Sequence, residues 1–366
     1  MIPFLDMKAV YAELKPELDA AYQRVMDSGW FVLGREVEAF EAEYARFCGT
    51  AHCVSLGNGL ESLELVLRAW DIGTGDEVIV PSNTYIATWL AVSATGAQVV
   101  PVEPTPAGAN IDPDRIAAAI TARTRAIMPV HLYGEPADMD AIMALAERHG
   151  LEVVEDVAQA QGARVRGRRT GSLGHAGAHS FFPTKNIGAF GDAGGVTTND
   201  GALAARLRAL RNYGSRVKYV NIERGFNSRL DEMQAAFLRV KLTRLDAWNE
   251  HRRLVAARYF DSLSGIADLQ LPRPPQWAEP VWHLYVVRTP RRAELMAALD
   301  KAGIGSLIHY PIPPHLQQAY ADLGLGKGAQ PLAEAMADTV LSLPMGAHIE
   351  LRTVDKIAAV VRAALS

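Results

Sequence analysis

Short apolar runs alternate with amphipathic segments between about residues 50 and 200, and this alternation constrains the fold more than any other feature. In "GLESLELVLRAWDIG", apolar residues recur at helical spacing: Leu63, Val66, Leu67 and Trp70. Strands that are apolar throughout and separated by helices predict a mostly parallel sheet covered on both faces. The runs expected to form strands are mostly β-branched and span residues 77–82, 97–103, 125–134, 151–158, 178–183 and 194–200.

The pattern changes after about residue 215, and the change predicts a second domain. Residues 228–263 have the pattern of a long helix, and a proline-rich connector, "LQLPRPPQWAEP", follows. The rest of the chain mixes a strand pattern, "VWHLYVVRT", with helical ones. We therefore expect an α/β protein with a large domain of residues 1–245, built on a mostly parallel sheet flanked by helices, and a smaller α+β domain of residues 246–366.

Composition and charge exclude several classes of protein. The 366 residues carry a formal charge of -4, which gives no reason to expect a nucleic-acid partner. The basic run at 163–171, "ARVRGRRTG", predicts an exposed hairpin rather than a diphosphate site. No run of about 18 apolar residues is present, so we predict no membrane span, and the first residues lack a signal-peptide pattern. Cys48 and Cys53 form neither a disulfide framework nor a metal site, so we expect a cytoplasmic protein with reduced thiols.

Three short stretches carry chemistry, and the first is a glycine-rich helix start, "SLGNGLESLELVL". Gly57 and Gly59 flank Asn58 just before the predicted helix. Glycines let the backbone approach a ligand closely, and free N–H groups at a helix start attract phosphate. A simple turn would explain the same residues, because neither the Walker pattern nor the dinucleotide fingerprint is complete.

The other two stretches supply a carboxylate and an amine. "VVEDVAQAQGA" places Glu155 and Asp156 at the end of an apolar strand, where open α/β sheets bind ligands, although a helix cap is the alternative. "HSFFPTKNIGAFGDAGG" places Lys185 after a strand end and Pro183. An enclosed lysine becomes nucleophilic because loss of solvation lowers its pKa, although an ordinary surface lysine also suits this position.

Together the three stretches match the needs of pyridoxal 5′-phosphate (PLP). A lysine forms a Schiff base with its aldehyde, a carboxylate keeps its pyridine nitrogen protonated, and a helix start holds its phosphate. We predict these roles for Lys185, Asp156 and the helix start at Gly59. An aromatic ring should stack on the cofactor, and Tyr85 in "PSNTYIAT" follows another predicted strand.

The chain strongly resembles the DegT–StrS family of PLP-dependent sugar-nucleotide aminotransferases, which have the aspartate aminotransferase fold (fold type I). The motifs run nearly from end to end and include "FLDMKAVYAEL", "GDEVIVPSNTYIAT", "VVEDVAQAQGA", "SFFPTKNIGAFGDAGG" and "GFNSRLDEMQAAFLRVKL". The resemblance implies a homodimer with shared active sites, in which Lys185 moves protons as general base and acid. It assigns the cofactor contacts to Gly59, Leu60, Glu61, Tyr85, Asp156, Gln159 (at the phenolic oxygen), Ser180 and, across the dimer, Asn227.

Within the family, the chain is most similar to enzymes that aminate carbon 3 of dTDP-3-keto-6-deoxyhexoses, on "NGLESL", "NTYIAT", "KYVNIERGFNSRLDE" and "LIHYPIPPHLQQAY". The implied reaction takes the amino group from L-glutamate, through the pyridoxamine phosphate form, and gives a dTDP-3-amino-3,6-dideoxyhexose. The resemblance implies that His309 and Tyr310 contact the sugar nucleotide, together with Lys218 of the partner subunit. Arg229 would face its diphosphate. An ordinary loop histidine at 309 and a helix-start salt bridge at 229 are the open alternatives.

Three departures from the family pattern bear on specificity. Leu60 and Glu61 stand where Thr and Asp are common, which removes a hydroxyl contact to phosphate. Phe182 stands where tyrosine is common and lacks a hydroxyl that relatives direct at the sugar, and Glu135 replaces a common glutamine.

The alternative functions are amination at carbon 4, a PLP-dependent dehydratase and a non-catalytic regulator. Dehydratases carry histidine at the lysine position, and a regulator would have lost the lysine, the aspartate or the helix-start glycines.

Overall fold

Seven strands form the central sheet of the protein, whose computed structural model describes residues 1–365. They are β1 (His52–Leu56), β2 (Glu77–Pro81), β3 (Gln98–Val102), β4 (Thr124–Ile127), β5 (Glu152–Asp156), β8 (Ala176–Ser180) and β9 (Gly194–Thr198). Their order is β1-β9-β8-β5-β4-β2-β3. Six of them lie on the six predicted runs. The exception is β1, whose five residues include two polar ones and give no apolar run.

All strands of this sheet except β9 run in the same direction. β2, β3, β4, β5 and β8 pair in parallel, whereas β9 pairs antiparallel with both β8 and β1. The prediction of a mostly parallel sheet is therefore confirmed. Because the carboxyl ends of the parallel strands meet at one edge, the loops that follow β2, β5 and β8 lie together there.

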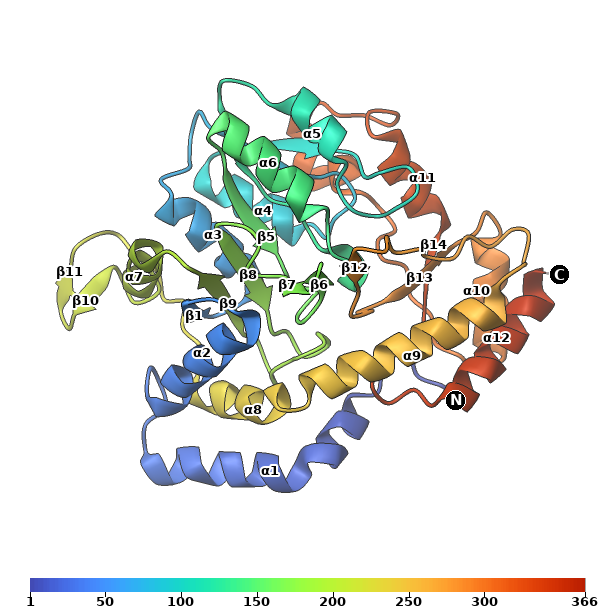
Figure 1. Cartoon of the computed structure of the whole chain (residues 1–366), viewed down its shortest axis with the longest axis horizontal. Coiled ribbons are helices and arrows are strands. Elements are labelled where there is room, and N and C mark those ends of the chain that lie inside the picture. The colour runs from blue at the N-terminus through green and yellow to red at the C-terminus, as the bar shows by residue number, and fades with distance from the viewer. Residues whose placement is uncertain (366) are drawn as a thin grey trace.

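Helices cover both faces of the sheet, as its apolar strands require. They are α3 (Gly59–Ala69), α4 (Ala87–Thr95), α5 (Pro113–Ala119), α6 (Met139–His149) and α7 (Gly201–Leu210). Side chains alternate between the faces: Val78 and Val80 join the core beneath α3, α4 and α7, whereas Ile79 joins the core beneath α5 and α6. Figure 1 shows these two groups of helices on opposite sides of the sheet.

The long helix predicted at residues 228–263 is interrupted. It consists of α8 (Glu232–Leu242) and α9 (Leu245–Leu263). α8 packs against two helices from the start of the chain, α1 (Met7–Ser28) and α2 (Arg35–Cys48), whereas α9 extends away from the central sheet (Figure 1). No helix within residues 1–365 combines the length and the apolar character needed to cross a membrane.

A second hydrophobic core lies along α9, toward the C-terminal end of the chain. Val255 and Tyr259 of α9 pack there against helices and a two-stranded sheet. Ile2 pairs with Ile304, so the first residues also pack against this core. The domain boundary at residue 245 stays a prediction. The later elements of this part are β13 (Tyr285–Arg288), α10 (Arg292–Lys301), α11 (Pro331–Thr339), β14 (Val340–Leu343) and α12 (Leu351–Leu365).

The remaining elements are short: β6 (Arg164–Val165), β7 (Arg168–Arg169), β10 (Ser215–Val217), β11 (Val220–Asn221), β12 (Ala278–Glu279), η1 (Leu132–Gly134), η2 (Pro314–Leu316) and η3 (Gln318–Leu323). β6 and β7 form the hairpin predicted for the basic run, with Arg166 and Gly167 at positive φ in its turn. β10 and β11 form a second hairpin, which projects from the body of the protein beside α7 (Figure 1).

α2 begins without a side-chain cap of its own, and Glu232 of α8 supplies one. The Glu232 carboxylate accepts hydrogen bonds from the backbone N–H groups of Gly34 (2.7 Å), Glu36 (2.9 Å) and Val37 (3.0 Å). A buried acceptor at a helix start satisfies N–H groups that the helix leaves unpaired, and its charge favours the positive end of the helix dipole. Glu232, which is buried, therefore joins α2 to α8.

Removal of this cap should destabilise the fold. Glu232→Ala leaves three N–H groups without their acceptor, so we expect the free energy of unfolding to fall by about 3 kcal/mol. Glu232→Gln keeps an acceptor and should cost less. The matched control is Glu17→Ala, which removes an exposed carboxylate 3.6 Å from Arg244 and should change the free energy by less than about 0.5 kcal/mol. Urea unfolding followed by tryptophan fluorescence measures all three, and equal effects of the two alanine variants would contradict the capping role.

Candidate active site

A cavity of about 460 Å³ lies at the carboxyl edge of the parallel strands. The loops after β2, β5 and β8 form three of its walls, and the first residues of α3 form a fourth. A loop before η2 closes it from the C-terminal part of the chain. The cavity brings together these residues predicted from the sequence: Gly59, Leu60, Tyr85, Asp156, Gln159, Ser180, Lys185, His309 and Tyr310.

Lys185 lines this cavity with an amine that has no hydrogen-bond or ion-pair partner in the described part of the chain. Burial lowers the pKa of Lys185 to about 8, although the neighbouring Asp156 carboxylate raises it in part. A pKa of about 8 in place of 10.5 increases the neutral fraction at neutral pH by about 300-fold. The amine is therefore prepared to act as a nucleophile and as a base.

Asp156 is held in place by hydrogen bonds to both carboxylate oxygens. Thr88 donates its hydroxyl to Oδ2 (3.0 Å), and the Ala158 N–H donates to Oδ1 (3.0 Å). Burial raises the pKa of Asp156, while these two hydrogen bonds and the positive charge of Lys185 oppose the rise. Thr88 has no part in the roles predicted from the sequence. The available signal was its place in "PSNTYIAT", the same loop that carries Tyr85.

The start of α3 forms the end of the cavity that suits a phosphate. Asn58 caps the helix by accepting a hydrogen bond from the Glu61 N–H (2.9 Å), so that N–H already has an acceptor. The N–H groups of Gly59 and Leu60 have none among the described residues. A Cβ at Gly59 would lie 2.5 Å from the Cβ of Ser180, so only glycine allows α3 to begin against that serine.

Tyr310 connects several residues on the opposite wall. Gln159 donates an amide N–H to the Tyr310 hydroxyl (3.0 Å), and the rings of Tyr310 and Tyr85 lie 5.3 Å apart. The amide oxygen of Gln159 accepts a hydrogen bond from the Tyr133 N–H (2.7 Å). Both ends of the Gln159 amide are thus paired within the protein. The amide nitrogen has a second N–H without a partner among the described residues, and its predicted contact with the phenolic oxygen of PLP stays a prediction.

Two histidines border the site, and both are neutral at physiological pH. Burial lowers the pKa of His309 to about 4, and the positive charge of Lys185 lowers it further. Its imidazole Nδ1 forms a hydrogen bond with the Ser342 hydroxyl (2.8 Å). Burial likewise holds the pKa of His283 well below its usual value. His283 also lines the cavity but is absent from the sequence predictions, because "VWHLYVV" has the pattern of a structural strand.

Glu61 and Arg229, which were predicted to contact ligands, lie outside the cavity lining. The Glu61 carboxylate accepts a hydrogen bond from the Ser228 hydroxyl. Arg229 donates to the side-chain oxygen of Asn212 (3.0 Å) and lies over the ring of Tyr213. No ion pair of Arg229 is present among residues 1–365, so it does not form the helix-start salt bridge considered from the sequence.

Lys218 and Asn227 also lie outside the cavity of their own chain. Lys218 is exposed in the turn between β10 and β11, and Asn227 is exposed just before α8. The resemblance places both residues in the active site of a neighbouring subunit, and that placement stays a prediction.

The residues of the cavity fit PLP. The unpaired Lys185 amine would take the aldehyde, and the buried Asp156 carboxylate would face the pyridine nitrogen. Ser180 and the N–H groups of Gly59 and Leu60 would hold the phosphate. With this sheet order and this site, the protein belongs to the PLP-dependent transferases of the aspartate aminotransferase fold.

Comparison with known proteins assigns the chain to one family of that class. It belongs to the DegT/DnrJ/EryC1/StrS aminotransferase family, whose sequence model matches residues 12–362. The chain is 56% identical over 360 residues to the dTDP-3-amino-3,4,6-trideoxy-alpha-D-glucose transaminase of Streptomyces venezuelae, covering 97% of this chain and 95% of that one. It is 54% identical over 362 residues to the erythromycin biosynthesis sensory transduction protein EryC1 of Saccharopolyspora erythraea, covering 99% of each.

A solved structure agrees with the fold. The crystal structure of S. venezuelae DesV in complex with a ketimine intermediate has a TM-score of 0.98 and 55% identity, covering 99% of this chain and 98% of that one. The predictions of an aspartate aminotransferase-like fold and of PLP as cofactor are confirmed, and the protein is a PLP-dependent aminotransferase.

The pKa of Lys185 predicts how the PLP-free protein captures its cofactor. Only the neutral amine attacks the aldehyde, so the rate of capture should rise with pH and level off above about pH 8. Asp156→Asn should move the midpoint to lower pH, because the carboxylate raises the pKa of Lys185. Stopped-flow absorbance of the bound cofactor measures the rate. Asp300→Asn, an exposed change outside the cavity lining, should leave the midpoint unchanged. A wild-type midpoint near 10.5, the usual lysine value, would contradict the role of burial.

Proposed function

We propose that the protein transfers the amino group of L-glutamate to carbon 3 of a dTDP-3-keto-6-deoxyhexose, which gives a dTDP-3-amino-3,6-dideoxyhexose. The observation that carries the proposal is the unpaired Lys185 amine in the active-site cavity, near the buried Asp156. The sugar and its carbon come from the relatives, since the S. venezuelae protein is named a dTDP-3-amino sugar transaminase. The proposal includes a cytoplasmic location, because two buried, unpaired cysteines suit a reducing compartment.

Lys185 would transfer protons, and Asp156 would supply a fixed negative charge to the cofactor. PLP, when bound, accepts electrons from the carbon at which a proton is removed or added. Lys185 would remove that proton and return it, and a pKa of about 8 makes both of its forms accessible near neutral pH. Thr88 and Ala158 fix the Asp156 carboxylate, so its charge stays directed at one point of the cavity.

The sugar nucleotide would enter beside His309 and Tyr310. Both side chains are neutral, so they can form hydrogen bonds with hydroxyl groups without adding charge to the site. Phe182 lines the same cavity and is 46% exposed. It offers an apolar surface where the family commonly has a tyrosine hydroxyl.

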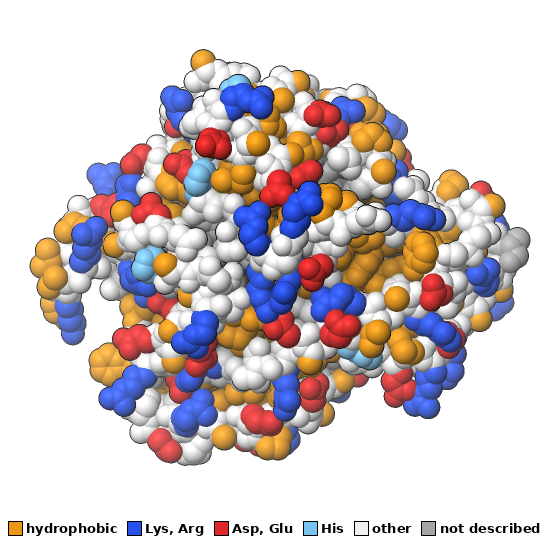
Figure 2. Space-filling view, viewed as in Figure 1, with side chains coloured by type: hydrophobic (Ala, Val, Ile, Leu, Met, Phe, Trp, Pro, Cys, Tyr) orange, Lys and Arg blue, Asp and Glu red, His pale blue; other side chains and the backbone are white. Residues whose placement is uncertain are grey.

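We also propose a homodimer with shared active sites. The β10–β11 hairpin exposes three apolar side chains: Val217 is 65% exposed, Tyr219 88% and Val220 53%. Figure 2 shows these apolar side chains at the edge of the molecule, where Figure 1 places the hairpin. Exposed apolar groups gathered in this way are typical of an interface. A second copy packed there would receive Lys218, and Asn227 would approach it from the adjoining loop.

The reaction can be tested directly with the purified holoenzyme. L-glutamate and dTDP-3-keto-6-deoxyglucose should give 2-oxoglutarate and a 3-amino sugar nucleotide, identified by mass spectrometry and NMR. Lys185→Ala should lower kcat by at least about 1000-fold, because it removes the proton-transfer group. Parallel assays use the galactose isomer, the 4-deoxy-3-keto sugar and a 4-keto sugar. Preference for the 4-keto sugar would establish amination at carbon 4, and no turnover with any of them would support a regulator.

Subunit mixing tests the shared site. Lys185→Ala and Asn227→Ala should each be impaired, but mixed dimers contain one site in which both native residues are present. Statistical mixing of equal amounts should restore about a quarter of the wild-type activity. A mixture of Lys185→Ala with Asp156→Ala is the control, because both residues belong to the same chain's cavity and no site is restored. Equal activities of the two mixtures would exclude the exchange of Asn227 between subunits.

A further inference from the structure

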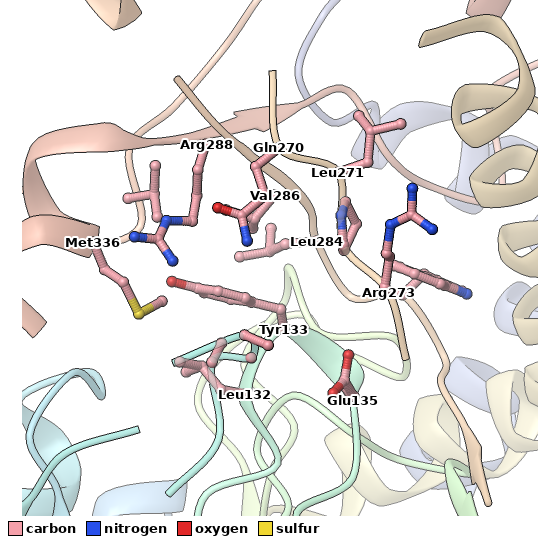
Figure 3. A pocket seen from close by; sticks show the side chains of 16 residues that line it. Leu132, Tyr133, Glu135, Gln270, Leu271, Arg273, Leu284, Val286, Arg288 and Met336 are labelled. Atoms are coloured by element: carbon pink, nitrogen blue, oxygen red, sulfur yellow. The ribbon is translucent and has the colours of Figure 1, made fainter. Parts of the chain in front are cut away.

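A second cavity lies outside the active site and contains the one family departure that has no role so far, Glu135. Its volume is about 60 Å³, enough for about four to six water-sized groups. One side is built from Leu132, Tyr133 and Glu135, in and just after η1, and the other from residues of β13 and the segment before it. Figure 3 shows the cavity between these two parts of the chain.

Glu135 points into this cavity without a partner. Its backbone is fixed, because its N–H donates to the Leu132 carbonyl (3.1 Å) and its carbonyl accepts from the Asn110 side chain (2.9 Å). Its carboxylate forms no hydrogen bond or ion pair within residues 1–365. Burial raises the pKa of the Glu135 carboxyl to about 7, which is the cost of a carboxylate that nothing in the protein compensates.

Arg288 supplies an uncompensated positive charge in the same cavity. Its Nε forms a long hydrogen bond with the Thr339 hydroxyl (3.4 Å), and no ion pair of Arg288 is present within residues 1–365. Burial lowers the pKa of its guanidinium. In Figure 3, Arg288 and Glu135 lie toward opposite ends of the Tyr133 side chain, and no ion pair joins them. The guanidinium of Arg273, also in the cavity lining, lies over the Phe260 ring.

We propose that this cavity binds a small zwitterionic amino acid as a second ligand. Its ammonium group would pair with the buried Glu135 and its carboxylate with the half-buried Arg288, so each charge would gain the partner it lacks. Its aliphatic body would contact the apolar walls of the cavity, which are Leu132, Leu284, Val286 and Met336. A ligand with one charge would satisfy only one side of the cavity and leave the other uncompensated.

Tyr133 connects this cavity to the active site. Its side chain lines the second cavity, while its hydroxyl donates to the His309 carbonyl (2.5 Å) and its N–H donates to Gln159 (2.7 Å). His309 and Gln159 both line the active-site cavity. An amino acid lying on Tyr133 would therefore restrain two residues of the active-site wall, and occupancy of one cavity would bear on the other.

Calorimetric titration of the holoenzyme in its pyridoxamine phosphate form tests the proposal, because that form has no aldehyde to react with amines. The probes are glycine and L-alanine, with isopropylamine and isobutyrate as analogues that carry one charge each. At about pH 8, where Glu135 is ionised, at least one zwitterion should bind once per chain. Glu135→Gln, which places the common family residue there, and Arg288→Gln should each weaken binding by about tenfold or more. Arg352→Gln, an exposed change outside both cavity linings, is the matched control and should change binding by less than about twofold.

The following results would overturn the proposal of a second amino-acid site. Unchanged affinity in Glu135→Gln would place the amino acid elsewhere, the active-site cavity included, and would overturn the proposal. So would isobutyrate or isopropylamine that binds as tightly as the zwitterions, or the absence of binding by both zwitterions up to about 20 mM. If Arg288→Gln does not fold, Glu135→Gln and the two singly charged analogues decide alone. The measurement needs no turnover, so its outcome is independent of the proposed sugar substrate.

Discussion

The burial of the Asp156 carboxylate at the end of β5 is the constraint on which the site depends. With 5% of its surface exposed, water cannot solvate the charge, so protein groups must do so. Thr88 and Ala158 donate to its oxygens, and the charge of Lys185 also stabilises the carboxylate. The raised pKa of the aspartate and the lowered pKa of the lysine are two consequences of the same exclusion of water. Strand order makes this possible, because β5 lies between β4 and β8.

The strands and the loops after them could be predicted because each signal is local. An uninterrupted apolar run needs no knowledge of its neighbours, and parallel strands place the loops that follow them at one edge. Contacts between distant segments carry no such signal. Thr88 reaches Asp156 across 68 positions, and Glu232 caps α2 across nearly 200. Those contacts depend on how whole elements pack, and packing is not written in any short stretch of sequence.

The residues implied by family resemblance divide in a similar way. Those in the loops at the sheet edge, including Tyr85, Gln159 and Lys185, meet in one cavity of one chain. Lys218 and Asn227 lie outside it, and the resemblance predicts that they reach the site of a second copy of the chain. Glu135 differs again. The resemblance identifies it only as a departure, and its lack of an ion-pair partner among the described residues is evident only in three dimensions.

The contact between Gly59 and Ser180 distinguishes a position that accepts no side chain from the positions of this site that can accept other side chains. Any side chain at position 59 must push α3 away from β8, and the N–H groups proposed to hold the phosphate would move with the helix. Phe182 and Leu60 border open space, so their side chains can be exchanged while the backbone stays in place. Selection for a new sugar can therefore act on one set of positions without loss of the cofactor. The fold can therefore keep its cofactor chemistry while its sugar specificity changes during evolution.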